Sequence, residues 1–246
     1  MAYKDSSAYD NNLFFEQYMK RRHREESPNI IIEKPALLEL IGDVNDQVIL
    51  DLGCGDASLG IEFIKSNCRS YTGIDGSKNM YQKALQNLYG TVGEVFLTSM
   101  LDYTYPRNSF DIVTSQLAIH YIEDIHKLFE KVYETLKVDG RFIFSVQHPI
   151  LTSSVESMTT NGKRTNWLVD HYFYSGKRVE PWIGEQVIKF HRTIEEYFVT
   201  LQKSGFVIEG LKEATPVKEN FKRIEEYERR MRIPLFLLFS CRKPSH

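Results

Sequence analysis

The sequence predicts a doubly wound α/β domain, in which helices cover both faces of a seven-stranded, mostly parallel sheet with an antiparallel last strand and an inserted cap. Three observations support this fold class. The chain of 246 residues, 42% hydrophobic and 26% charged, suits one domain with a large core. Short apolar runs alternate with segments of helical period. Five successive strand–helix steps then favour right-handed crossovers and a parallel sheet.

The first helix is predicted over residues 9–23. Apolar and aromatic residues recur there at roughly helical spacing: Leu13, Phe14, Tyr18 and Met19. Two interpretations of this helix stay open, because it could pack against the helical layer or form a lid over a ligand. The basic run at 20–24 is followed directly by Glu25 and Glu26, which favours a solvated helix end.

A second helix is predicted over Lys34–Ile41. Pro35 suits its first turn and Gly42 suits its C-cap. Residues 1–44 are therefore interpreted as an N-terminal helical lid that precedes the sheet.

The first strand, Val48–Leu52, is a short apolar run that ends in a glycine-rich turn. Gly53 and Gly55 allow positive φ and leave no Cβ, so a ligand can approach the backbone. From about Ala57 the pattern becomes helical, with these predicted buried positions: Leu59, Ile61, Phe63 and Ile64. Strand, glycine turn and helix in this order typically bind a nucleotide or nucleoside at the carboxyl end of the strand.

The next strand is predicted at 69–74, and it ends on Asp75, Gly76 and Ser77. Ser77 can cap a helix over Lys78–Leu88. The predicted buried face of that helix consists of Met80, Ala84, Leu85 and Leu88. The remaining elements of a cofactor-binding core over 45–147 are strands at 94–97 and 110–114, a helix at 123–136 and a strand at 141–147.

Residues 148–190 form the predicted cap. This stretch is rich in aromatic residues and lacks a clean period, which indicates an insertion over the carboxyl edge of the sheet that carries substrate contacts. The last part, 191–246, completes the sheet. Its predicted elements are a helix at 193–204 opened by a Thr193–Glu196 capping box, strands at 206–211 and 234–240, and a charged helix at 218–232.

Composition excludes several classes of partner. The formal net charge of −2 provides no basic footprint for nucleic acid, and we see no apolar run that would span a membrane. The three cysteines and seven histidines lack metal-ligand spacing, so no metal is expected. We expect a cytoplasmic protein, monomeric or homodimeric, with a small-molecule partner and no secretory signal.

The glycine turn also discriminates between nucleoside ligands. Asp75 lies about twenty residues past the turn, where a carboxylate can accept both ribose hydroxyls. Ser58 replaces the third glycine of a dinucleotide fingerprint, and Asp51 would repel a pyrophosphate. These residues favour an amino-acid-bearing nucleoside sulfonium over NAD.

Five motifs carry a resemblance to a known family. They are VILDLGCG at 48–55, GID at 73–75, NSFDIV at 108–113, LAIHY at 117–121 and LKVDG at 136–140. Together they resemble the class I S-adenosylmethionine-dependent methyltransferases of the bacterial small-molecule type, similar to methyltransferase types 11 and 12. Two departures are Asp56-Ala57-Ser58 after the glycines, and Ser99, where the family commonly has an acidic residue.

The resemblance implies a Rossmann-like fold, S-adenosyl-L-methionine as the cofactor and S-adenosyl-L-homocysteine as the product. Asp51 and the turn would hold the methionine end and Asp75 the ribose, while Met80 and Met100 would flank the adenine. The full predicted cofactor set is Tyr18, Asp51, Gly53, Cys54, Gly55, Asp75, Gly76, Met80, Met100, Leu101, Ser115 and Gln116.

His120 and His148 follow two strand ends, and we predict them as catalytic bases, since imidazole can accept a proton near pH 7. The alternative for each is a hydrogen bond to nearby backbone. The predicted substrate set is Phe14, His120, Tyr121, His148, Trp167 and Trp182. The two tryptophans could instead form the small core of the cap, and His171 and His191 are expected to be structural or to orient the substrate.

These observations predict a methyltransferase that moves a methyl group to an oxygen, nitrogen or carbon atom of a small apolar or planar metabolite. One alternative is a tRNA or protein methyltransferase, which the absence of a basic face and of an Asn-Pro-Pro motif disfavours. A non-catalytic S-adenosylmethionine-binding module and an NAD-linked dehydrogenase are the others.

Overall fold

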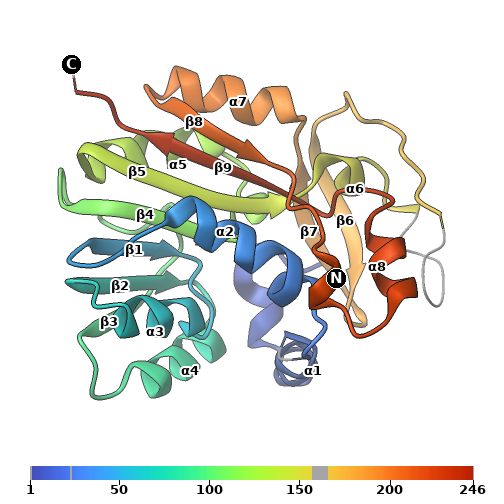
Figure 1. Ribbon diagram of the computed structural model, residues 1–246, viewed down its shortest axis with the longest axis horizontal. Coiled ribbons are helices and arrows are strands. Elements are labelled where there is room, and N and C mark those ends of the chain that lie inside the picture. Colours follow the sequence, from blue (N-terminus) through green and yellow to red (C-terminus); the bar gives the residue numbers. More distant parts are fainter. Residues whose placement is uncertain (1, 23, 157–165, 246) are drawn as a thin grey trace.

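The computed structural model describes residues 2–22, 24–156 and 166–245. Its centre is a seven-stranded sheet in the order β3-β2-β1-β4-β5-β9-β8. The strands are β1 (Val48–Leu52), β2 (Ser70–Asp75), β3 (Gly93–Leu97), β4 (Phe110–Gln116), β5 (Leu136–Gln147), β8 (Val207–Lys212) and β9 (Phe236–Arg242). Neighbours among β1 to β5 pair in parallel, whereas β9 is antiparallel to both β5 and β8. The predicted fold class is confirmed (Figure 1).

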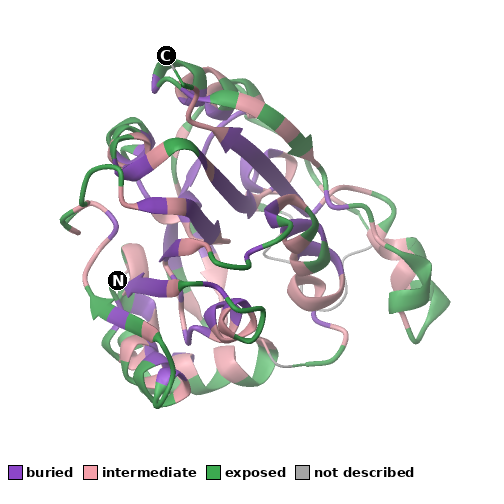
Figure 2. Cartoon of the chain, turned by 60° about the vertical axis from the view of Figure 1, so that its left-hand side comes forward, coloured by how far each residue is buried: buried purple, intermediate pink, exposed green. Residues whose placement is uncertain are grey.

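Helices cover both faces of this sheet. The helices of the core are α2 (Lys34–Ile41), α3 (Ser58–Lys65), α4 (Lys78–Leu88), α5 (Ile125–Thr135) and α7 (Ile194–Lys203). Successive side chains of a strand point to opposite faces, so one strand supplies two cores. In β5, Phe142 and Phe144 belong to the core that includes residues of α5 and α7, whereas Ile143 belongs to the core that includes residues of α2, α3 and α4. Buried residues accordingly lie along the central strands (Figure 2).

Several predicted helix ends are confirmed in detail. Gly42 ends α2 at φ 65°, and Pro35 stands in the first turn of that helix. The Ser77 side chain accepts from the Met80 N–H, and Thr193 forms the predicted capping box with Glu196. These short-range motifs depend on a few consecutive residues, which is why sequence alone locates them.

Two predicted helices are broken, and three predicted buried positions differ. The helix predicted over 9–23 is a 3₁₀ turn, η1 (Asp5–Asp10), followed by α1 (Asn12–Arg22); His23 lies outside the described residues. The helix predicted over 218–232 is a short η5 (Lys218–Asn220) and α8 (Ile224–Arg230). Leu85 is 41% exposed, because Met80, Ala84 and Leu88 at i, i+4 and i+8 form the buried line of α4. Ile61 and Ile64, by contrast, are half-buried.

The cap contains a hairpin that the sequence pattern did not predict. It consists of β6 (Gly176–Trp182) and β7 (Glu185–His191), preceded by a short α6 (Pro149–Ser153). The turn residues Ile183 and Gly184 both have positive φ. Five consecutive residues of β7 are buried, so the alternation that marks a strand is missing. Residues 157–165 of the predicted cap lie outside the described part of the chain.

The N-terminal segment joins the cap rather than the sheet. Tyr3 pairs with Val187 of β7 through backbone hydrogen bonds of 2.8 Å to Gln186 and from Ile188. Phe14 packs with Ala8 and Val187 in a third, smaller core. In Figure 1 the N-terminal segment, the hairpin and α8 all lie beyond the carboxyl ends of the parallel strands. That edge of the sheet therefore carries the site.

Candidate active site

The glycine turn after β1 is fixed by backbone geometry. Gly53 and Gly55 have φ of 70° and 58°, and the Gly53 and Cys54 N–H groups both donate to the Ile74 carbonyl, at 2.8 and 3.0 Å. A Cβ on Gly53 would lie 2.5 Å from the Ala118 Cβ. Only glycine fits this position, because a side chain here would collide with the neighbouring residues.

Asp75 ties the turn to the next helix. One carboxylate oxygen accepts from the Gly55 N–H at 2.9 Å, and the other accepts from the Ser77 N–H at 2.8 Å. Burial raises the pKa of Asp75 to about 6, although the two N–H donors oppose this rise. The carboxylate predicted to bind ribose is thus held rigidly beside the glycines.

These residues enclose a cavity of about 380 Å³, which we call the cofactor cavity. Nine of the twelve predicted cofactor residues line it: Tyr18, Gly53, Gly55, Asp75, Gly76, Met80, Met100, Leu101 and Gln116. Tyr121, predicted for the substrate, lines it as well. Leu117 at the tip of β4 also lines it, with a φ of 54° that is unusual for a branched side chain.

Asp51, Cys54 and Ser115 do not line the cofactor cavity. Ser115 donates to the Leu52 carbonyl at 2.7 Å and so joins the ends of β4 and β1. Asp51 accepts from the Tyr71 hydroxyl at 2.9 Å, while its Oδ1 is buried without a hydrogen-bond partner in the described residues. Burial is the main cause that raises the pKa of Asp51, to about 7.

The N-terminal segment covers this cavity. Asp10 accepts from the Ser77 hydroxyl at 2.8 Å, and Asn79 donates to the Tyr9 carbonyl at 3.0 Å. The Tyr9 and Tyr18 rings meet edge to face with centroids 4.9 Å apart, and both line the cavity. The segment therefore has the position of a lid, and whether it opens stays a prediction.

Arg22 is a site residue that sequence reasoning placed in a solvated helix end. Its side chain is only 20% exposed, donates to the Tyr18 hydroxyl at 3.1 Å and lies 3.8 Å from the Asp56 carboxylate. The basic run had no period that distinguished Arg22 from its neighbours. Its helical spacing from Tyr18, four residues away, is the signal that could have identified it.

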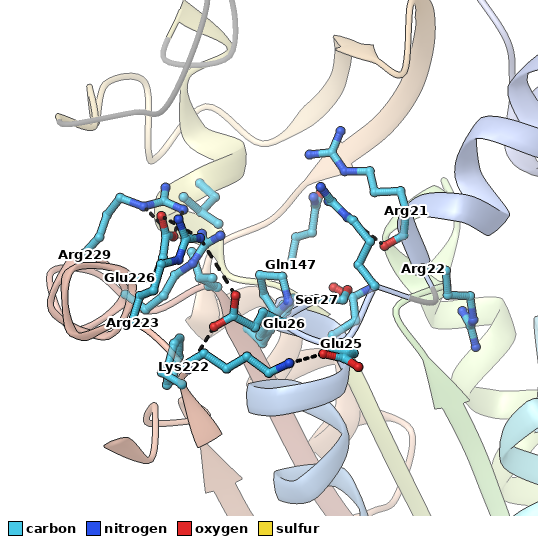
Figure 3. Close-up of a pocket in the computed structure, with 18 of the residues that line it drawn as sticks. Arg21, Arg22, Glu25, Glu26, Ser27, Gln147, Lys222, Arg223, Glu226 and Arg229 are labelled. Carbon is cyan, nitrogen blue, oxygen red and sulfur yellow. Dashed lines mark hydrogen bonds and ion pairs between the residues drawn. The ribbon is translucent and has the colours of Figure 1, made fainter. Parts of the chain in front are cut away.

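A second cavity of about 760 Å³, which we call the acceptor chamber, adjoins the first. Tyr18 and Arg22 line both cavities. Its other walls come from the ends of β5 and β9, from the hairpin and from the segment around α8 (Figure 3). Of the predicted substrate residues, Trp167 and Trp182 line the chamber, whereas Phe14, His120 and His148 line neither cavity.

The two predicted catalytic histidines are buried. His120, in the turn η3 (Ile119–Tyr121), packs against Tyr121 with the rings tilted and their centroids 4.6 Å apart, and its Nδ1 has no hydrogen-bond partner among the described residues. Burial, helped by Lys189 and Arg192, lowers the pKa of His120 well below its ordinary value, so the ring is neutral at pH 7.

His148 has a different environment. Its Nδ1 accepts from the Ile150 N–H at 3.2 Å and caps α6, while its Nε2 lies 2.9 Å from a Glu213 oxygen. Both ring nitrogens of His148 therefore contact protein groups. This environment agrees with the alternative interpretation, in which His148 forms a hydrogen bond with nearby backbone. His191 likewise contacts the Thr152 hydroxyl and the Tyr172 carbonyl, at 2.7 and 2.8 Å.

A buried ion pair lies between the two cavities. Lys189 of β7 donates to Glu180 at 2.8 Å and to Gln147 at 2.9 Å, and its ammonium lies 5.1 Å from the centre of the Trp182 ring. Gln147 and Trp182 line the acceptor chamber. This pair joins the two strands of the hairpin, and the hydrogen bond from Lys189 to Gln147 fastens the hairpin to the end of β5. Removing one partner of the pair would leave a buried charge.

Glu33 is a further buried acid that sequence reasoning missed. It accepts from the Gln116 amide at 2.6 Å, and burial raises its pKa to about 7.

Among the described residues no cluster of three or more metal-ligating side chains occurs. Nor does the described part of the chain contain a helix long and apolar enough to span a bilayer.

The sheet order and the acidic residue facing a glycine turn define the class I methyltransferase architecture. Residues 50–144 match the family model "Methyltransferase domain". A solved structure from Listeria monocytogenes, assigned as an S-adenosylmethionine-dependent methyltransferase, is 34% identical, with a TM-score of 0.79 over 87% of this chain and 97% of that one. A methyltransferase structure from Mesorhizobium loti is 32% identical, with the same TM-score over 85% and 97%.

The chain therefore belongs to the S-adenosylmethionine-dependent methyltransferase family. Phosphoethanolamine N-methyltransferase 2 of Caenorhabditis elegans is 31% identical over 124 residues, which are 49% of this chain and 28% of that protein. This likeness is confined to about half of the chain.

Proposed function

We propose that the cofactor cavity binds S-adenosylmethionine and that the acceptor chamber presents a small molecule to its methyl group. The observation that supports this most directly is the shared wall formed by Tyr18 and Arg22. Transfer from a sulfonium is an in-line displacement, so catalysis depends on aligning two bound molecules and excluding water. Two adjoining cavities under a cap and a lid meet that requirement.

The residues of the cofactor cavity fit this cofactor. Its volume of about 380 Å³ falls in the usual range for small-molecule sites. When bound, the cofactor supplies an activated methyl group on a sulfonium. Asp75 would accept the ribose hydroxyls, Met80 and Met100 would flank the adenine, and Leu101 would support it. Gln116, at the end of β4, would lie nearest the sulfonium.

Charge complementarity at the methionine end supports the same assignment. Arg22 would pair with the carboxylate, because its guanidinium is held by Tyr18 and Asp56 beside the glycine turn. The orphaned Oδ1 of Asp51 is a buried acceptor that a ligand ammonium could satisfy, directly or through water. Cys54 and Ser115 would act by holding the turn and the strand end in place.

The acceptor would place a planar or apolar part against Trp167 and Trp182. We propose that it is methylated on an oxygen, nitrogen or carbon atom that faces the Tyr18–Arg22 wall. His120 touches Tyr121 and not the chamber, so we assign it a positioning role through that ring. His148 would secure α6 under the chamber.

Calorimetric titration with S-adenosylmethionine and S-adenosylhomocysteine tests the cofactor assignment. We expect one site per chain, and absence of binding would refute the proposal. A metabolite screen for S-adenosylhomocysteine release tests the acceptor assignment. Methylation of tRNA or protein alone, or cofactor binding without any turnover, would favour the alternatives.

A further inference from the structure

The acceptor chamber is basic, although the whole chain is slightly acidic. Its lining includes seven cationic side chains: Arg21, Arg22, Arg24, Lys222, Arg223, Arg229 and Arg230. Three carboxylates, Glu25, Glu26 and Glu226, also line it. A formal net charge of −2 for the chain makes this local excess of positive charge a specific feature of the chamber. Cavity walls that carry mostly one sign of charge concentrate ligands of the opposite charge.

The three carboxylates hold three of the cations, Lys222, Arg223 and Arg229, in place. Glu226 accepts from the Nε and Nη2 of Arg229 at 3.2 and 2.8 Å, and its other oxygen lies 3.7 Å from Arg223. Glu25 and Glu26 join Lys222 and Arg223 across the chamber wall. Arg229 is only 19% exposed, and its Nη1 forms no hydrogen bond with another described residue. A guanidinium oriented in this way is prepared to bind an anion.

Cations come from two sides of the chamber. Figure 3 shows Arg223 and Arg229 on one side, and Arg21 and Arg22, from the end of α1, on the other. On the second side, the Arg21 guanidinium lies 5.0 Å from the centre of the Trp182 ring. The chamber therefore combines a flat aromatic wall with fixed positive charge, a pattern suited to an anion with a planar or apolar body.

We infer that the methyl acceptor is an acidic small molecule, a carboxylate or a phosphate monoester on an apolar or planar body. Its anionic end binds Arg229, with Arg223 contributing, while Arg21 adds positive charge from the opposite wall. This inference rests on the proposed function, because it assigns the larger cavity to the acceptor. The reactive atom then lies at the opposite end, beside Tyr18 and Arg22, where the cofactor cavity begins.

The chain provides its own reporter for this subsite. Its two tryptophans, Trp167 and Trp182, both line the acceptor chamber, so intrinsic fluorescence reports occupancy. The probes are cyclohexanecarboxylate, cyclohexyl phosphate and the neutral cyclohexanecarboxamide, titrated at low salt with S-adenosylhomocysteine present. We expect at least one anion to bind at least about tenfold more tightly than the amide, which is about 1.4 kcal/mol. The anion that binds more tightly then identifies the acid group of the methyl acceptor.

Variants locate the subsite. Arg229→Gln should remove most of the preference for the anion, and Arg21→Gln on the other wall should reduce it. Arg107→Gln, in an exposed position outside both cavities, is the control and should leave the preference intact. If circular dichroism shows that Arg229→Gln does not fold, Arg21→Gln and Arg223→Gln decide the question.

Equal binding of the amide and both anions would overturn the inference, as would an anion preference that survives Arg229→Gln and Arg21→Gln. The basic residues would then serve only to hold the chamber walls together. Failure of the proposed function is a separate result, because calorimetry would show no cofactor binding. The anion titration can still be carried out without S-adenosylhomocysteine.

Discussion

The two cavities of this protein differ in charge although they share a wall. The cofactor cavity is lined by four acidic side chains, Asp5, Asp75, Glu123 and Asp124, against three basic ones. The acceptor chamber has seven basic side chains against three acidic ones. Arg22 stands at the boundary and lines both. Opposite fields in adjoining cavities would sort a cationic sulfonium from an anionic acceptor before any specific contact forms.

The cavities also differ in construction. The cofactor cavity is built from strand tips and backbone turns, which the hydrogen bonds of the sheet hold rigidly. The acceptor chamber is built from long side chains on α1, α8 and the hairpin, held by ion pairs. A substitution in the glycine turn should therefore act through sterics, and one in the wall of the acceptor chamber through charge.

The largest effect is expected at Gly53. Gly53→Ala would force a Cβ to within 2.5 Å of Ala118 and 2.7 Å of Met100, at a φ of 70°. We expect S-adenosylmethionine affinity to fall by more than about 100-fold, because the backbone of the turn must move. Gly42→Ala is the matched control: its φ is 65°, but no atom lies within 4 Å of the added carbon. Calorimetry should show normal cofactor binding there, with some loss of stability.

The next largest effect is expected at Asp75. Asp75→Ala removes the acceptor of two backbone N–H groups and the proposed ribose ligand. We expect cofactor affinity to fall by about 10- to 100-fold, in line with the loss of charged hydrogen bonds. Asp43→Ala, which loses an exposed hydrogen bond from the Asn45 N–H outside the cofactor cavity, is the control. Unchanged affinity in Asp75→Ala would contradict the ribose assignment.

A smaller effect is expected at Arg22. Arg22→Gln should weaken cofactor binding by about tenfold, because one charge-assisted hydrogen bond to the methionine carboxylate is lost. Lys20→Gln, on the exposed side of the same helix, should have no effect. Titration with adenosine, which lacks the carboxylate, sharpens the test: Arg22→Gln should not weaken its binding. Equal losses for both ligands would indicate that Arg22 supports only the local structure.

Sequence alone predicted the cofactor cavity far better than the acceptor chamber, and the reason is physical. Gly53, Asp75 and Met80 lie in consecutive strand–turn–helix units, where local motifs determine position. Arg22 and Arg229 line one chamber only because distant segments fold over the same sheet edge, and no periodicity in the sequence encodes that arrangement. The hairpin β6–β7 was missed for a related reason. Its buried Glu180 and Lys189 look like solvent-exposed residues until their pairing is seen.

The smallest expected effect is a pH dependence of the stabilisation that the cofactor provides. Burial raises the pKa of Asp51 and Glu33 to about 7 and that of Asp75 to about 6, above their values in an unfolded chain. The folded protein thus binds protons more tightly than the unfolded one, and its free energy of unfolding falls as pH rises from about 4 to about 8. Above about pH 8 these groups contribute no further change.

The sulfonium and ammonium groups of the bound cofactor would favour the ionised form of these carboxylates. Cofactor binding would therefore offset the loss of stability at higher pH. The rise in melting temperature caused by S-adenosylmethionine should therefore be larger at pH 8 than at pH 6, by about 2–4 °C for each kcal/mol recovered. Differential scanning fluorimetry at pH 6 and pH 8 measures this rise in melting temperature, with Asp51→Asn as the comparison. The variant lacks one of the titrating carboxyls, so the difference between the two pH values should shrink. A difference of the same size in Asp51→Asn would assign the effect to Asp75 and Glu33 and leave Asp51 without a role at the ammonium.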